Sequence, residues 1–307
     1  MRQILKWVLP FAVSGGILAY LLAGIDMRGL VEHVTLDVTL VLVPALLIFG
    51  AISLFIEAVC LVRLVPASRD VFNLMTAARV KSASYLLYIV NYTLGAGALT
   101  LLLRQRAKMS LSDAGGVVIL LAAFDLGLLL AVTAIGAVWS GAETPAMLAG
   151  VITVAGVGLV GGLAVLRTSR SLGPLERLRS LTLFRAARTS APSLLIEIGL
   201  LRLLFVFNFI GLAWITLVAF DVLVPLGDVI VNFSVVALIS TLPIAVAGLG
   251  TGQATFVFVF REWADQETLL ACSLAFSIGM IVLRAALGFF FSYEFVREAL
   301  RAREKEG

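Results

Sequence analysis

Five ionisable side chains lie inside long apolar stretches of this chain, where a charge is costly. They are Glu57, Asp125, Glu197, Arg202 and Arg284. A charged residue near the centre of a bilayer costs about 2.5–3.5 kcal/mol on insertion scales, so each one requires a partner or a water-filled cavity. Arginine is suited to bidentate binding of a phosphate, and a carboxylate can balance its charge or take up a proton. These residue types indicate recognition of an anionic group within a membrane.

Asp125 and Arg284 both fall near the middle of their apolar stretches, and two interpretations are open for them. One is a structural salt bridge between the two residues. The other is a substrate site in which Arg284 and Arg202 bind a phosphate while Asp125 is the counter-charge. Glu57 and Glu197 fall nearer the cytoplasmic ends of their stretches, where snorkelling to the surface is a sufficient explanation.

Two glycine-rich turns add backbone groups to the candidate site. The first contains Asn91, Gly95 and Gly97, and the second contains Pro243, Gly248, Gly250 and Gly252. A helix broken at membrane depth leaves unpaired backbone groups that only protein or a water-filled cavity can surround. The N-terminus of a half-helix carries partial positive charge, which suits a phosphate. The alternative is that these glycines merely permit close helix packing.

The composition indicates which elements position these residues. Of the 307 residues, 61% are apolar and 14% are charged, whereas soluble globular proteins have about 45–50% and about 25%. This balance excludes a soluble enzyme, a disordered chain and a nucleic-acid binder with a basic surface. One histidine and two cysteines also exclude a histidine-rich metal site and a disulfide framework. What remains is an α-helical protein that crosses a membrane many times.

Six apolar stretches reach the roughly 20 residues that a membrane-spanning helix needs. They are residues 5–24, 38–62, 114–139, 145–166, 192–220 and 268–296. Two further stretches, 82–103 and 229–260, contain the glycine-rich turns, and each is predicted to be a pair of half-helices that enters and leaves on one side. The sequence therefore predicts an all-α polytopic membrane protein with six transmembrane helices and two re-entrant helical hairpins.

The distribution of basic residues supports this topology. With both broken stretches re-entrant, 19 of the 23 lysines and arginines lie on the cytoplasmic side, together with both termini. If residues 82–103 crossed the membrane instead, the split would fall to 14 against 7 at best. We therefore expect a single membrane domain in a bacterial or archaeal cytoplasmic membrane. Residues 1–141 and 142–307 would then form an inverted repeat, because corresponding spans run in opposite directions.

The C-terminal third resembles the transmembrane-region family of lysylphosphatidylglycerol synthase/flippases. Residues 242–258, LPIAVAGLGTGQATFVF, followed by Arg284, look like the family's Leu-Pro…Gly-x-Gly…Glu segment and its downstream arginine. Gln253 stands where the family has its glutamate. The family also includes stand-alone, flippase-like inner-membrane proteins that have no soluble domain.

The resemblance is weaker in the first half of the chain. Asn91 and Asp125 match the family pattern, whereas Gly95 replaces its proline and Leu121-Ala122 replaces its Glu-Arg pair. The resemblance implies translocation of lipids between leaflets. It does not imply lipid aminoacylation, because the sequence lacks the aminoacyl-transfer domain of the bifunctional members.

The leading hypothesis is a flippase-like lipid transporter that moves an anionic phospholipid or a polyprenyl-phosphate-linked lipid between leaflets. Its candidate substrate-binding residues are Arg284, Arg202, Asp125, Glu197 and Gln253, together with those of the two turns. The alternative is a non-transporting membrane subunit that anchors or regulates a glycosyltransferase or a lipid-modifying enzyme. An intramembrane enzyme is disfavoured, since no plausible nucleophile–base pair is present. We expect membrane lipids as partners, with a second copy or a membrane enzyme as a further option, and no nucleic acid, cofactor or metal.

Overall fold

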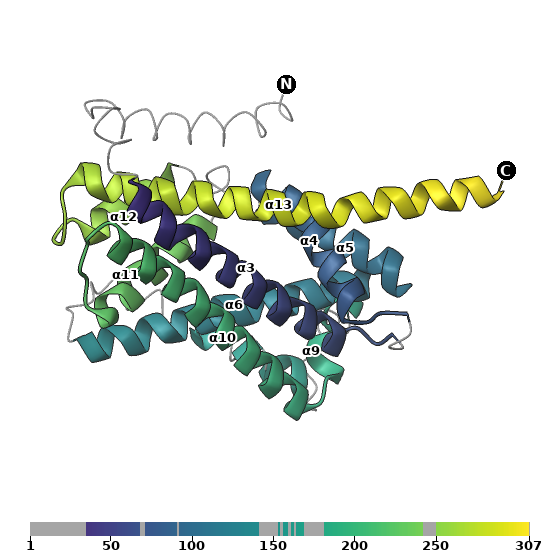
Figure 1. The fold of residues 1–307 in the computed structure, drawn as a ribbon. Helices are drawn as coiled ribbons and strands as arrows, with labels where there is room; N and C mark the ends of the chain where they lie inside the picture. The colour runs from purple at the N-terminus through teal and green to yellow at the C-terminus, as the bar shows by residue number, and fades with distance from the viewer. Residues whose placement is uncertain are drawn as a thin grey trace, which may run out of the picture.

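The computed structural model describes residues 35–67, 71–90, 92–140, 153, 156–158, 161–162, 164–168, 181–241 and 250–306. Within these residues every regular element is a helix and no strand occurs (Figure 1). The predicted all-α class is confirmed for this part of the chain.

Four long apolar helices form the frame of the molecule. They are α3 (Leu36–Leu64), α6 (Leu111–Ser140), α10 (Pro192–Ala219) and α13 (Gln266–Glu306). Each contains an apolar segment long enough to cross a membrane, and each covers one of the predicted spans. These helices support a helical membrane protein. The other two predicted spans, 5–24 and most of 145–166, lie outside the described residues.

The outward faces of the long helices are apolar. Leu47 of α3, Leu200 of α10 and Phe290 of α13 are each more than 60% exposed. In water, contiguous exposed apolar surface of this kind promotes association, whereas lipid tails solvate it. The exposed side chains therefore agree with the apolar composition in pointing to a bilayer as the solvent.

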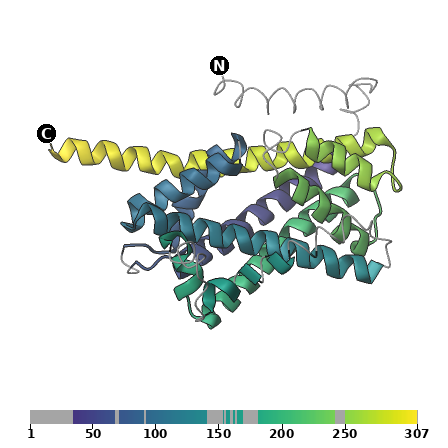
Figure 2. The ribbon, with the colours of Figure 1, turned by 180° about the vertical axis from the view of Figure 1, so that it is seen from behind.

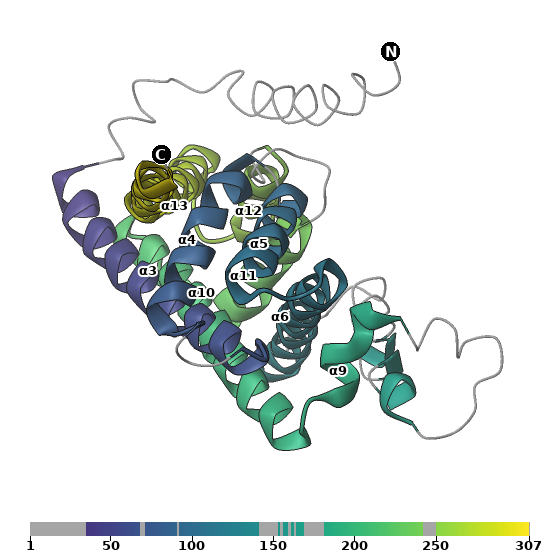
Figure 3. The ribbon, with the colours of Figure 1, turned by 90° about the vertical axis from the view of Figure 1, so that its right-hand side faces the viewer.

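Two pairs of shorter helices pack among the long ones. They are α4 (Leu74–Val90) with α5 (Tyr92–Ala107), and α11 (Leu226–Thr241) with α12 (Thr251–Phe260). Within each pair the two helices contact each other (Figure 3). Each pair therefore has the helix–break–helix order that the sequence predicts, and re-entrance stays a prediction.

The predicted turn over residues 91–97 is wrong for residues 92–97, because Gly95 and Gly97 lie within helix α5. Gly252 of the second predicted turn likewise lies within α12. In the first pair α4 ends at Val90 and α5 begins at Tyr92, and α4 begins at Leu74, well ahead of the predicted start at residue 82. In the second pair α11 ends at Thr241 and α12 begins at Thr251, and residues 242–249 between them lie outside the described residues. Asn91, Pro243 and Gly248 are among the residues that the structure does not describe.

The helices pack as a bundle around the shorter pairs. In this bundle α3 contacts α10 and α4, α6 contacts α11 and α10, and α13 runs along α4 and α12 (Figures 1 and 3). The short helices η2 (Thr182–Phe184) and α9 (Arg185–Thr189) pack against α6. The C-terminal part of α13 continues well beyond the other helices (Figure 2).

Glycines bring α3 and α13 close together. A Cβ atom on Gly279 would lie 2.5 Å from Cδ1 of Leu46, and one on Gly50 would lie 2.8 Å from Cδ1 of Leu283. Each helix thus presents a leucine to a glycine of the other, which is the packing that small residues permit between membrane helices. This contact fixes the distance between two walls of the cavity described below.

An aspartate caps the start of α13. The carboxylate of Asp265 accepts backbone N–H bonds from Glu267 and Thr268, both at 3.0 Å, and the hydroxyl of Thr268 at 2.8 Å. These bonds, those from Thr268 above all, lower the pKa of Asp265 below its usual value. Because the folded pKa is lowered, the stabilisation is present above the unfolded pKa of about 3.9 and is lost as the pH falls through the folded value.

Replacing this cap tests whether α13 begins where the structure places it. We expect Asp265→Ala to lower the free energy of unfolding at neutral pH by about 1 kcal/mol, since two backbone donors lose their acceptor. Thermal unfolding of the detergent-solubilised protein measures the loss. Glu262→Ala is the control, because this exposed residue precedes the helix and caps nothing in the described structure. Equal stability of the two variants would contradict the cap.

Candidate functional site

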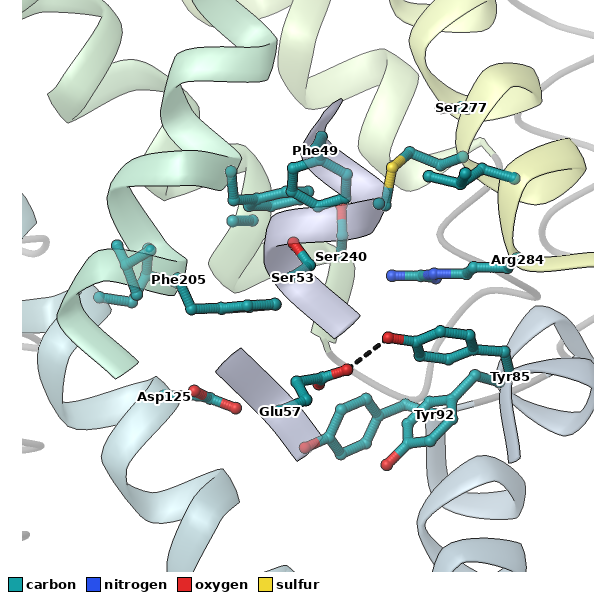
Figure 4. Close-up of a pocket in the computed structure, with 18 of the residues that line it drawn as sticks. Phe49, Ser53, Glu57, Tyr85, Tyr92, Asp125, Phe205, Ser240, Ser277 and Arg284 are labelled. Carbon is teal, nitrogen blue, oxygen red and sulfur yellow. Dashed lines mark hydrogen bonds between the residues drawn. The ribbon is translucent and has the colours of Figure 1, made fainter. Parts of the chain in front are cut away.

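The described helices surround a cavity of about 510 Å³ in the middle of the bundle (Figure 4). Residues of α3, α4, α5, α6, α10, α11, α12 and α13 line it. Both shorter helix pairs therefore contribute to its wall, together with all four long helices. A cavity of this size is within the range of small-molecule sites, about 300–1,000 Å³.

The wall of the cavity has a charged part and an apolar part. The charged part consists of Glu57, Lys81, Asp125, Arg202 and Arg284, with Tyr85, Tyr88 and Tyr92 beside them. The apolar part includes a cluster of contacting rings from four helices, namely Phe49, Phe209, Phe233 and Phe276. Figure 4 shows Phe49 on one side of the cavity and Asp125, Glu57 and Tyr92 on the other. The cavity is amphiphilic.

Asp125 forms its salt bridge with Arg202. This decides the first of the two interpretations given above, a structural salt bridge between Asp125 and Arg284. Nε of Arg202 donates to Oδ1 of Asp125 at 2.6 Å, and its Nη2 bonds to the other carboxylate oxygen. The Arg202 side chain is 4% exposed and that of Asp125 is 31% exposed. Depth in the membrane alone suggested a salt bridge between Asp125 and Arg284. That pairing is wrong, because α10 rather than α13 supplies the arginine.

Glu57 lies at the centre of a second set of polar contacts. Lys81 Nζ is 2.7 Å from Glu57 Oε1, the hydroxyl of Tyr85 donates to Oε2, and Nη1 of Arg202 lies 3.8 Å from Oε1. Glu57 is 6% exposed. Snorkelling to the surface is therefore the wrong explanation for Glu57, since its side chain points inward to Lys81 and Tyr85. Figure 4 shows the contact with Tyr85.

Lys81 and the tyrosines beside it were missed in the sequence because Lys81 was counted as a basic residue of a cytoplasmic loop. The structure places it on α4, inside the bundle, where its Nζ lies 5.6 Å and 4.9 Å from the ring centroids of Tyr85 and Tyr88. The spacing of residues 81, 85 and 88 is that of one helical face, and this signal could have identified them.

Arg284 is the cation of the cavity wall that no acid neutralises. In the described part of the chain it forms no salt bridge and no hydrogen bond, and Figure 4 shows its side chain pointing into the cavity above Tyr85. The wall carries two carboxylates and three basic groups. Because Lys81 and Arg202 neutralise Glu57 and Asp125, the net charge of +1 belongs to Arg284.

Of the predicted site residues at α12, one lines the cavity and the others form hydrogen bonds that hold the start of the helix. Gly252 lines the cavity. Gly250 begins α12 at φ 91°, a conformation that favours glycine, and its N–H donates to Oε1 of Gln253 at 2.6 Å. Nε2 of Gln253 donates to the Ser277 hydroxyl at 2.9 Å. Gln253 is buried and joins the start of α12 to α13, outside the cavity wall.

Three other predicted residues lie away from the cavity wall. Glu197 accepts a hydrogen bond from Nε of Arg63 at 2.6 Å, and both side chains are more than one third exposed. A Cβ atom on Gly95 would lie 2.1 Å from Cγ of Tyr88, which agrees with the helix-packing interpretation at that position. A Cβ atom on Gly97 would meet nothing within 4 Å.

Comparison of the chain with protein-family models, with curated proteins and with solved structures found no match. Resemblance to the lysylphosphatidylglycerol synthase/flippase family therefore rests on the motif residues quoted above. In the described residues no group of three or more histidine, cysteine, aspartate or glutamate side chains could hold a metal ion.

Breaking the buried pair of Glu57 and Lys81 should be costly. We expect Lys81→Met to lower the free energy of unfolding by about 3–5 kcal/mol, because it leaves a buried carboxylate without its nearest cation. The double variant Lys81→Met/Glu57→Gln should recover most of that loss. Thermal unfolding in detergent measures both. Arg63→Gln, which breaks the exposed pair with Glu197, is the control and should cost much less. Equal losses in the lysine and arginine variants would contradict the buried network.

Proposed function

We propose that this protein moves an anionic lipid between the leaflets of a cytoplasmic membrane, and that the cavity binds the lipid headgroup. The observation that carries the proposal is Arg284 on the wall of an amphiphilic cavity, without a salt bridge to any acid of the described residues. A cation without a partner is unfavourable inside a membrane, so a site that keeps one is suited to an incoming anion. Guanidinium groups bind phosphate oxygens in bidentate geometry, which favours a lipid phosphate.

The apolar part of the wall supports a lipid rather than a small hydrophilic anion. A lipid phosphate carries acyl or polyprenyl chains, and the ring cluster of Phe49, Phe209 and Phe233 offers those chains apolar contacts beside the charged part. The cavity holds the headgroup and the beginning of the chains rather than a whole lipid. Movement of a headgroup through such a cavity requires the chains to remain in the bilayer.

The broken helix pairs support transport through an inverted repeat. In the proposed topology there are six spans, two re-entrant hairpins and cytoplasmic termini, and the substrate site lies at the interface of the repeats. Residues of α4 and α5 from the first half and of α11 and α12 from the second half all line the cavity. The motif resemblance to lysylphosphatidylglycerol synthase/flippases agrees with this proposal.

Liposomes containing the purified protein test the function. We expect faster movement of a fluorescent phosphatidylglycerol between leaflets than in empty liposomes. Arg284→Ala should reduce the rate at low substrate about ten-fold or more, because losing one charge-assisted interaction costs about 1.5–3 kcal/mol. Arg284→Lys should retain part of the activity, since it keeps the charge but not the bidentate geometry.

Arg63→Ala is the matched control, because Arg63 lies outside the cavity wall and pairs with Glu197. Its rate should equal that of the wild type. If no phosphate-bearing lipid moves faster with the protein than without it, the transport proposal is wrong. A stable membrane enzyme that co-purifies with such an inactive protein would favour the anchoring or regulatory subunit instead.

A further inference from the structure

The two carboxylates of the cavity are held in different ways. Glu57 has Lys81, Tyr85 and one nitrogen of Arg202 around it. Asp125 has Arg202 as its only hydrogen-bonding partner in the described part of the chain. The Asp125 side chain is 31% exposed, against 7% for Glu57. Asp125 is therefore the carboxylate that depends on a single partner and faces the cavity.

Arg202 is shared between both carboxylates. Its Nε and Nη2 hold Asp125, while its Nη1 lies 3.8 Å from Glu57. While Asp125 is ionised, Nε and Nη2, a pair that can bind a phosphate in bidentate fashion, are occupied. A proton on Asp125 removes the charge that holds them, and Glu57 keeps the guanidinium in place.

We propose that the cavity binds a lipid phosphate together with a proton, and that the proton is carried by Asp125. The proton from water binds a carboxylate oxygen of Asp125, and Arg202 transfers its Nε–H and Nη2–H bonds from the carboxylate to the phosphate, beside Arg284. When the phosphate leaves, Arg202 binds the carboxylate again and the proton returns to water. Only an O–H bond forms and breaks. This inference rests on the proposed function and adds a coupling ion to it.

The charge of the cavity is balanced through this exchange. A phosphodiester brings one negative charge and the proton brings one positive charge, so the net charge of +1 from the three basic groups and two acids is unchanged. An ionised Asp125 would repel the phosphate across a low-dielectric cavity. Proton binding and phosphate binding are therefore linked, and each increases the affinity for the other.

Other charged and titratable groups surround Asp125 on every side of the cavity. They are Arg202 on α10, Glu57 and Cys60 on α3, Lys81, Tyr85 and Tyr88 on α4, Tyr92 on α5 and Arg284 on α13. The α11 residues of the cavity wall include no titratable side chain. Glu57 keeps its charge through the exchange, because Lys81 and Tyr85 do not leave it. Asp125 is the carboxylate that loses its partner, Arg202, when the phosphate binds.

Proton uptake on lipid binding tests the proposal directly. Dihexanoyl phosphatidylglycerol is added to the purified protein in weakly buffered detergent that contains a pH indicator. A phosphodiester does not titrate near neutral pH, so any uptake belongs to the protein. We expect the wild type to take up a proton with each lipid bound. Asp125→Asn, which has the neutral shape of the protonated residue, should bind the lipid without uptake.

The affinity of the wild type is a second measurement that needs no variant. It should fall at least about five-fold between about pH 5.5 and pH 8, as expected for a typical coupling free energy. In Asp125→Asn the affinity should not change over this range. Glu197→Gln is the matched control, because this carboxylate lies outside the cavity wall, and it should retain both the proton uptake and the pH dependence.

The outcomes separate the two proposals. Lipid binding without proton uptake and without pH dependence in the wild type would overturn the coupling and leave the lipid-binding function standing. Proton uptake that persists in Asp125→Asn would place the proton elsewhere and overturn the role of Asp125. Absence of binding of this lipid and of a polyprenyl phosphate at every pH would overturn both proposals.

Discussion

A charge inside a membrane protein needs a partner or a water-filled cavity, and a cluster of four residues supplies such partners here. Glu57, Lys81, Arg202 and Asp125 come from α3, α4, α10 and α6, so their pairing ties four helices together. Apolar contacts between membrane helices specify little, because lipid tails are as apolar as leucine. A polar cluster of this kind specifies which helices are neighbours and how each is rotated.

The remaining contacts of the bundle are of the close-packing type. The glycine–leucine contacts between α3 and α13 bring Arg284 to the cavity without a salt bridge to hold it. Among the described residues Arg284 is therefore positioned by helix packing without an ion pair, whereas Arg202 is held by two carboxylates. A ligand that binds Arg202 must therefore displace a carboxylate, whereas a ligand that binds Arg284 displaces no acid of the described residues.

The sequence predicts how deep a residue lies in the membrane better than it predicts which helices are neighbours. The four described spans were found from apolar length, and the cavity contains four of the five ionisable residues within apolar stretches, the exception being Glu197. Asp125 and Arg284 share a depth, but depth does not determine the rotation of a helix or which helix lies opposite. The partner of Asp125 therefore could not be deduced, and the structure places Arg202 there.

The treatment of Lys81 shows a second limit. Counting lysines and arginines near the ends of apolar stretches gives the orientation of the chain, but it treats every one of them as exposed. Because α4 begins at Leu74, Lys81 lies within a helix rather than in a loop. Its side chain is buried and pairs with Glu57, although the charge count had assigned it to the cytoplasmic surface. The spacing of residues 81, 85 and 88 is helical across the predicted start at residue 82. This periodicity indicates that Lys81 belongs to the helix, which the count of basic residues does not consider.

The two broken helix pairs contribute unlike chemistry to a common cavity. Lys81, Tyr85 and Tyr88 of α4 surround Glu57, whereas Phe233 of α11 belongs to the ring cluster. An inverted repeat with identical halves would offer the same groups from both pairs. For a lipid bound as proposed, this asymmetry gives the headgroup and the chains separate parts of the wall. The proton exchange at Asp125 then takes place beside the first pair, where all the carboxylates of the cavity lie.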